Sequence, residues 1–154
     1  MTKIERSVEI NAPVEKVFLF ISNPKNQEKI FSDSKFKIED VSMQPDGVGT
    51  KFRVSAFMGG RNVKPHWHEF VEFEEDRRIV SHEVKGGGGA MKSEDLTFVL
   101  GTTTDKGTKL TIIADYEFPY SVIGRLVDTL AFKKAFELLV EGGTRRTKEI
   151  LEAA

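Results

Sequence analysis

Residues 50–61, TKFRVSAFMGGR, decide the fold of this chain. Phe52, Val54, Ala56 and Met58 occupy every second position, an alternation that is typical of a β-strand with one face in a core. The Gly59-Gly60 pair that follows is a two-residue hairpin signal. The stretch therefore predicts an antiparallel hairpin whose second strand begins at residue 61.

The same signals recur on both sides of this hairpin. Alternating or apolar stretches joined mostly by short turns predict strands over residues 3–10, 34–43, 50–58, 61–74, 77–85, 90–100 and 108–118. The alternation slips between Ile38 and Val41, which predicts a bulge there. Because short connections join antiparallel neighbours, the sequence predicts a seven-stranded antiparallel sheet.

Three helical segments complete the chain. A first helix follows the Asn11-Ala12-Pro13 capping sequence, a second covers residues 24–31, and a third runs from Pro119 to about Glu152. The last segment has two apolar stripes that point in different directions, so we expect either a break near Ala131 or a helix contacted from two sides. This order of elements predicts an α+β fold in which the last helix covers the apolar face of the sheet.

The composition restricts the class of protein. With 154 residues and a formal net charge of -1, the chain lacks the basic excess of a nucleic-acid-binding protein. No apolar run reaches the ~20 residues that span a bilayer, and residues 1–6 do not begin a secretory signal. The absence of cysteine excludes disulfides, thiolate zinc sites and cysteine nucleophiles. We therefore expect a single cytoplasmic domain over residues 1–154, with neither a nucleic-acid partner nor stable membrane insertion.

Four segments resemble the START/Bet v 1-like (SRPBCC) superfamily, in particular its polyketide cyclase/dehydrase-like branch. They are residues 8–18 (VEINAPVEKVF), 46–53 (DGVGTKFR), 107–111 (GTKLT) and 118–126 (FPYSVIGRL). The resemblance implies a helix-grip fold, in which a curved sheet wraps around the C-terminal helix and a lipophilic cavity lies between them. It does not imply one activity, since the superfamily includes carriers, cyclases and hydroxylase domains.

The parity of residues 61–74 suggests which side chains face such a cavity. The odd positions are the more apolar, which places Trp67, Glu69 and Val71 on the concave face, unless a bulge near Glu69 turns it outward. Arg6 shares its parity with apolar neighbours and either reaches the pocket or extends into solvent. The expected ligand-binding residues are Arg6, Trp67, Glu69, Val71, Phe98, Tyr116, Phe136, Leu139 and Gly143.

Metal and catalytic sites are expected to be absent. His66 and His68 would place two imidazoles on one strand face, as a zinc site requires, but Asn62 and Lys64 share that face, and no third ligand follows from spacing. No nucleophile elbow, phosphate-binding loop, zinc-protease motif or dinucleotide fingerprint occurs in the sequence. We therefore assign no metal, cofactor or catalytic residue from the sequence.

Three functions remain open. The leading hypothesis is binding or transport of a lipophilic small molecule, such as a lipid, polyketide, isoprenoid or quinone. The alternative is an enzyme of the polyketide cyclase/dehydrase type that uses Glu69 or His82 for proton transfer. The third is a protein-interaction module with an exposed patch near Phe57 and Phe70. Several buried polar groups that converge on one point would favour the enzyme, whereas an apolar tube would favour the carrier.

Overall fold

A computed structural model describes residues 2–89, 91–118 and 126–153, and the side chains of 126–129 are not described. Seven antiparallel strands form one sheet in the order β1-β7-β6-β5-β4-β3-β2. The strands are β1 (Thr2–Ile10), β2 (Lys37–Ser42), β3 (Lys51–Met58), β4 (Arg61–Glu74), β5 (Arg78–Glu83), β6 (Ser93–Thr102) and β7 (Thr108–Glu117). The predicted seven-stranded sheet is confirmed.

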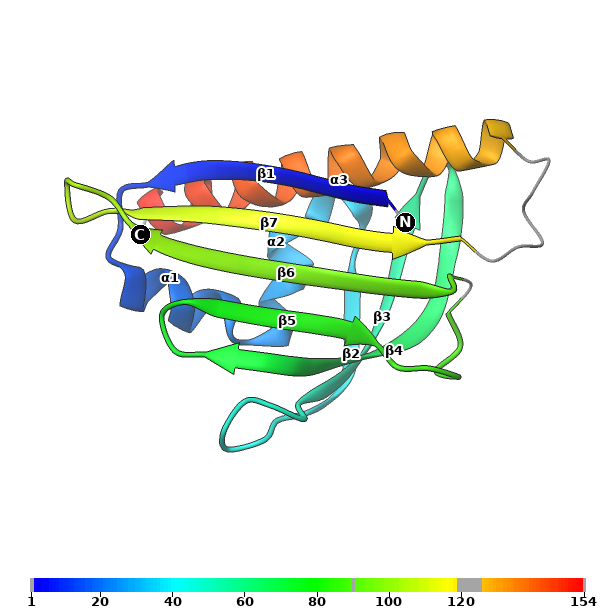
Figure 1. Cartoon of the computed structure of the whole chain (residues 1–154), viewed down its shortest axis with the longest axis horizontal. Coiled ribbons are helices and arrows are strands. Elements are labelled where there is room, and N and C mark those ends of the chain that lie inside the picture. Colours follow the sequence, from blue (N-terminus) through cyan, green and yellow to red (C-terminus); the bar gives the residue numbers. More distant parts are fainter. Residues whose placement is uncertain (1, 90, 119–125, 154) are drawn as a thin grey trace.

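One long helix and several short ones lie against this sheet. Helix α3 (Leu126–Ala153) packs on β1 and β7, and Figure 1 shows it running along these strands. The short elements α1 (Val14–Ile21), η1 (Pro24–Asn26), α2 (Gln27–Ile30) and η2 (Ser32–Ser34) connect β1 to β2. The fold is the predicted α+β helix-grip arrangement.

The structure decides between the two alternatives for the last helix. Helix α3 is continuous from Leu126 to Ala153, so the break near Ala131 does not occur. Its apolar residues meet different partners along its length, as the other alternative expects. Phe132 contacts Phe118, whereas Leu151 belongs to the core at the other end of the helix. The predicted beginning of this helix, at residues 119–125, lies outside the described residues.

Bulges bend the sheet at two strands. The pairing of β2 with β3 shifts between Glu39 and Ser42, which confirms the bulge predicted near Val41. Strand β4 carries two further irregularities, one opposite Ser55 and one at Val71, where the pairings with β3 and β5 shift. Because an extra residue increases local twist, these irregularities curl β2, β3 and β4 away from the rest of the sheet (Figure 1).

The core fills most of the space between the sheet and α3. Phe98 and Ile112 are fully buried on the inner face of the sheet, and α1 and α2 contribute Val17, Ile21 and Ile30 to the same core.

Among the described residues, no helix is long and apolar enough to cross a membrane.

Candidate functional site

Strand β4 turns its histidines inward, opposite to the sequence prediction. His66 and His68 are 5% and 4% exposed, and Phe70 is also buried. One bulge precedes His66 and another follows Phe70, and each exchanges the inward and outward positions of β4. Odd-numbered Val63 and Phe73 therefore face inward at the two ends of the strand, whereas even-numbered residues face inward between the bulges. The prediction assumed one alternation throughout residues 61–74, and the two reversals explain why it failed.

The residues of β4 predicted to face the cavity therefore lie on the outer face. Trp67 is half-buried beneath the Arg53 guanidinium, and Glu69 lies 4.0 Å from the Lys51 ammonium group. Val71 is 43% exposed. The placement of Trp67, Glu69 and Val71 in a pocket was wrong.

Arg6 is also placed outside the cavity. Its Nε donates a hydrogen bond to Glu141 Oε1 at 3.2 Å, and both side chains are substantially exposed. Arg6 has the parity of Ile4, but β1 is the edge strand, so its long side chain reaches past the core to α3. Of the two alternatives for Arg6, the structure shows the outward one.

A cavity of about 400 Å³ lies between the sheet and α3. Phe136 and Leu139 line it, as predicted, and α3 also contributes Phe132. The strands β3, β4, β6 and β7 and the connections before β2 and β6 supply the rest of the apolar wall: Phe36, Val54, Ala56, Met58, Val63, Met91, Leu96 and Ala114.

Three predicted ligand-binding residues lie in the core beside the cavity. Phe98 is fully buried, and Tyr116 stacks on Phe136 with ring centroids 4.2 Å apart. A Cβ on Gly143 would lie 2.5 Å from the ring of Phe31, so this glycine permits close packing of α3 on α2 and the sheet. These residues support the cavity wall, but they do not form its surface.

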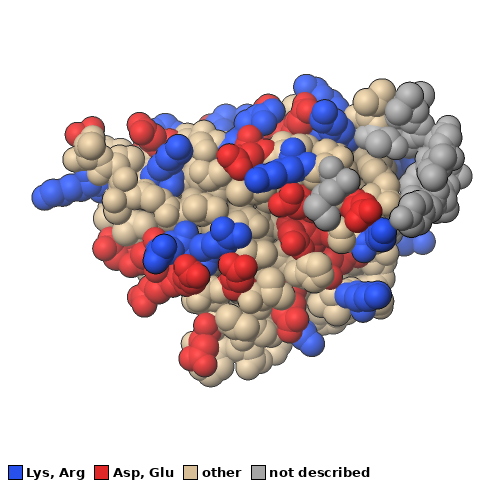
Figure 2. Space-filling view, viewed as in Figure 1, with Lys and Arg blue, Asp and Glu red and all other residues tan. Residues whose placement is uncertain are grey.

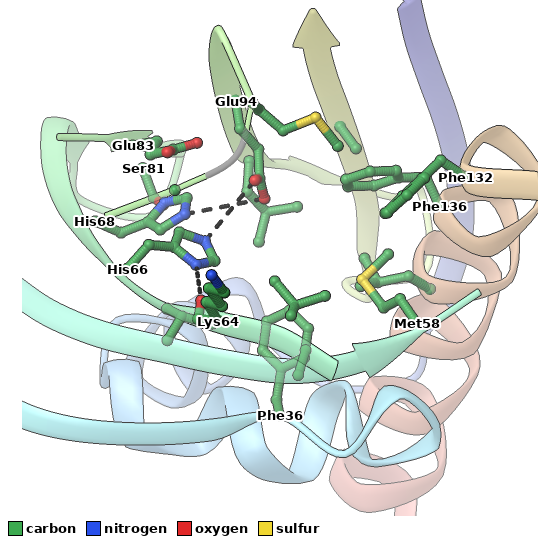
Figure 3. A pocket seen from close by; sticks show the side chains of 18 of the residues that line it. Phe36, Met58, Lys64, His66, His68, Ser81, Glu83, Glu94, Phe132 and Phe136 are labelled. Atoms are coloured by element: carbon green, nitrogen blue, oxygen red, sulfur yellow. Dashed lines mark hydrogen bonds and ion pairs between the residues drawn. The ribbon is translucent and has the colours of Figure 1, made fainter. Parts of the chain in front are cut away.

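Polar side chains converge at one end of the cavity (Figure 3). The Nε2 atoms of His66 and His68 lie 3.8 and 3.9 Å from the two carboxylate oxygens of Glu94. Ser81 Oγ lies 2.9 Å from His68 Nδ1, and Glu83 lines the same end. The cavity therefore has a long apolar wall and a polar cluster at one end, and its remaining polar lining residues are Gln27, Arg61, Asn62, Lys64 and Asp95.

Burial shifts the ionisation of this polar end. It raises the pKa of the Glu94 carboxyl to about 7; His66 opposes this increase, and Glu83 and Asp95 add to it. Burial lowers the pKa of His68 to about 3, and the nearby imidazoles of His66 and His82 lower it further. Burial also raises the pKa of Glu83. Desolvation is the main cause in each case, because charged forms lose hydration inside the protein.

The four consecutive glycines at residues 86–89, in the connection between β5 and β6, lie beside the polar end of the cavity. The Gly87 carbonyl accepts a hydrogen bond from Trp67 N at 3.2 Å, and Gly88 and Gly89 line the cavity. A Cβ on Gly89 would lie 1.5 Å from Glu83 Oε1. The loop therefore packs closely on β4 and β5, and its glycines allow the backbone to approach the Glu83 carboxylate.

Sequence reasoning missed most of the polar end. Glu94 shares the parity of Leu96 and Phe98 on β6, but alternation alone does not say whether a charged side chain near the end of a strand points into a cavity or into solvent. His82, by contrast, points outward from β5 and pairs with Asp95 on the surface. Only the register between β4, β5 and β6 brings Glu94 to the two histidines, and sequence alternation alone does not supply that register.

The outer surface carries a mixture of charges. Lysine and arginine side chains are interspersed with aspartate and glutamate over the described part of the face in Figure 2. Phe57, proposed for an interaction patch, is 40% exposed and lies beneath the Lys35 ammonium group, whereas Phe70 is buried. The patch predicted around these two residues is therefore not formed.

The sheet, the long C-terminal helix and the cavity between them define a helix-grip domain. A model of the family described as polyketide cyclase/dehydrase and lipid transport matches residues 1–152, and the chain belongs to this family. No curated protein matches the sequence.

Three solved structures illustrate the shared fold. The Thermus thermophilus protein TTHA0849 is 19% identical with a TM-score of 0.70, and the match covers 97% of this chain and 99% of that one. The ZhuI aromatase/cyclase from a Streptomyces species is 16% identical (TM-score 0.69, 99% and 92% covered). The di-domain aromatase/cyclase StfQ of the steffimycin pathway is 13% identical (TM-score 0.72), and the match covers 98% of this chain and 50% of StfQ.

Proposed function

We propose that this protein binds a lipophilic small molecule that carries a polar group at one end. The observation that carries the proposal is the cavity of about 400 Å³, which has a long apolar wall and a cluster of buried polar side chains at one end. Binding pockets for small molecules have volumes of about 300–1,000 Å³ and combine apolar walls with a few polar groups. The family description, which names polyketide cyclases and lipid transport, agrees with a ligand of this kind.

The two ends of the cavity suggest the orientation of the ligand. Phe132, Phe136 and Met58 surround the apolar part, where burial contributes about 25 cal/mol per Å² of apolar surface. A carbonyl, hydroxyl or carboxyl group of the ligand would lie against His66 and Glu94. There it could form hydrogen bonds with buried polar atoms such as His66 Nε2, which has no partner among the described residues. Affinity would come from the apolar end and orientation from the polar end.

A second candidate function is an enzyme of the cyclase/dehydrase type. It is favoured by the convergence of two imidazoles and two carboxyl groups at one end of the cavity, in contact with the space that the ligand would occupy. Glu69 and His82, the residues first considered for proton transfer, could not take part in such a reaction because their side chains face outward. Glu94 and His68 are the groups that could touch the reacting atoms.

Native mass spectrometry of the purified chain, alone and with dodecanoic acid, tests the binding proposal. Leu139→Trp should fill part of the cavity and weaken dodecanoate binding at least tenfold, whereas Leu138→Trp, one residue away on the exposed face of α3, should bind as the unmodified protein does. If Leu139→Trp does not fold, Ala114→Leu adds less volume to the opposite wall. Equal binding by the cavity-filling and surface variants would overturn the proposal.

The masses of co-purifying ligands distinguish a carrier from an enzyme. A carrier should retain the same compound in the unmodified protein and in Glu94→Gln. An enzyme whose chemistry needs Glu94 should accumulate unconverted substrate in Glu94→Gln, so the two bound masses would differ.

A further inference from the structure

We propose that His66, His68 and Glu94 form a binding site for a divalent first-row transition metal ion at the polar end of the cavity. The site shares the cavity with the proposed ligand, but it does not depend on that ligand. Its three donor atoms, His66 Nε2, His68 Nε2 and a Glu94 carboxylate oxygen, lie within 4.8 Å of one another.

The distances fit an ion better than they fit direct contacts among the three side chains. The Nε2 atoms of His66 and His68 lie 3.8 and 3.9 Å from Glu94 oxygens, which is too long for a hydrogen bond. Donors bound tetrahedrally at about 2.0–2.1 Å lie about 3.3–3.4 Å apart, whereas the three donor atoms lie within 4.8 Å of one another, so an ion would draw them together by up to about 1.4 Å. Small rotations of the Glu94 side chain and of the two imidazole rings would make this movement.

His66 Nε2 supplies an independent sign of a missing partner. The atom is buried and has no hydrogen-bond partner among the described residues. His66 Nδ1 lies 2.9 Å from the Lys64 carbonyl, which can only accept, so Nδ1 carries the proton. In the neutral form of this tautomer, the lone pair of Nε2 would point toward Glu94 and the cavity.

Both imidazoles are held as ligating histidines usually are. A metal-binding histidine commonly uses its other ring nitrogen to bond a carbonyl, a carboxylate or another polar group, and this contact fixes the ring. Here the Lys64 carbonyl holds Nδ1 of His66, and the Ser81 hydroxyl holds Nδ1 of His68 at 2.9 Å. Neither contact uses the Nε2 atoms, which remain available to a metal.

The donor set indicates both the class of ion and its access. Two imidazoles and a carboxylate suit zinc or iron, whereas magnesium and calcium prefer oxygen ligands. Three protein ligands leave a coordination position open, as in catalytic metal sites, and here that position faces the cavity. An ion in this place would polarise a carbonyl oxygen of a ligand bound in the apolar part.

Calorimetric titration of the untagged, EDTA-treated chain with Zn²⁺ alone tests the site. We expect the unmodified protein to bind one Zn²⁺ per chain. The dissociation constant for Zn²⁺ should be at least 100-fold higher in His66→Gln, His68→Gln and Glu94→Gln. His82→Gln is the matched control, because it removes the third histidine of the chain from a surface pair with Asp95. Zn²⁺ binding that is lost in His82→Gln, or retained in His66→Gln, would overturn the proposal.

Imidazole NMR of the unmodified protein gives a test that needs no folded variant. Zn²⁺ should shift the ring signals of His66 and His68 and leave those of His82 in place. Unchanged signals for His66 and His68 at saturating Zn²⁺ would contradict the site. Because no lipophilic ligand is present in either experiment, these outcomes do not bear on the binding function proposed above.

Discussion

Gly142 and Gly143 are neighbours on α3, but they have different surroundings. A Cβ on Gly143 would lie 2.5 Å from a Phe31 ring carbon and 3.2 Å from Ile112 Cδ1, both in the core. A Cβ on Gly142 would lie 3.0 Å from the end of the Asp33 side chain, which is exposed and can move. Both glycines lie inside α3, so the same substitution has the same effect on helix propensity at either position. A difference between the two variants therefore reports the difference in side-chain packing.

We therefore expect Gly143→Ala to destabilise the protein and Gly142→Ala to change it little. Overpacking a core costs about 1–3 kcal/mol, which exceeds the gain of up to about 1 kcal/mol from replacing a helical glycine. Urea unfolding should show Gly143→Ala to be less stable than Gly142→Ala by at least about 1 kcal/mol. Equal stabilities would contradict the packing of α3 on Phe31.

Fluorescence provides a second prediction at the residue scale. Trp67, the single tryptophan, lies on the outer face of β4, so a ligand in the cavity should leave its emission nearly unchanged. Phe136→Trp places an indole in the cavity wall, and its emission should shift saturably with dodecanoic acid. A strong response from Trp67 in the unmodified protein and none from Phe136→Trp would contradict the assigned inner face of β4.

The successes and failures of sequence reasoning at this scale have a common cause. Phe136 and Leu139 were correctly placed on the face of α3 that lines the cavity, because an uninterrupted helix keeps its 3.6-residue period. Trp67 and Glu69 were placed on the wrong face because bulges reverse the parity of β4 on both sides of them. A bulge changes the facing of every residue beyond it, and the sequence of residues 61–74 does not mark the two places where this happens.

At the scale of elements, Asp33 joins η2 to α3. Arg146 Nη2 donates to Asp33 Oδ1 at 3.0 Å, and Arg145 donates to the other oxygen. The hydrogen bond from Arg146, together with the charges of both arginines, holds the pKa of Asp33 below its usual value, although burial opposes this. A lowered folded-state pKa means that the pair stabilises the protein above the ordinary aspartate pKa, near 4, and less as the pH falls.

We expect Asp33→Asn to lower the free energy of unfolding at pH 7 by about 0.5–1 kcal/mol, since all three side chains are partly exposed and screened. The difference from the unmodified protein should begin to shrink below about pH 4, where this aspartate takes up a proton in the unfolded chain, and should vanish below the lowered pKa of Asp33 in the folded protein. Glu149→Gln is the control, because Glu149 pairs with the same arginines but within α3. A pH-independent difference for Asp33→Asn would show that the ion pair is not the cause.

At the scale of the whole molecule, local signals sufficed for the fold. Short turns and alternating strands defined the seven-stranded sheet, and only one element, the C-terminal helix, was long enough to cover it. The polar end of the cavity required more. Glu94, Ser81 and His68 lie on three different strands, and they meet only through the register of the sheet and its curvature.

The central claim is that the cavity between the sheet and α3 binds a lipophilic molecule. The most direct test is to titrate the ¹⁵N-labelled protein with dodecanoic acid and to follow its amide signals. We expect saturable shifts around His66 and His68 on β4 and around Phe132–Leu139 on α3, with little change at Arg6. The absence of saturable shifts, or shifts confined to the outer surface, would contradict it.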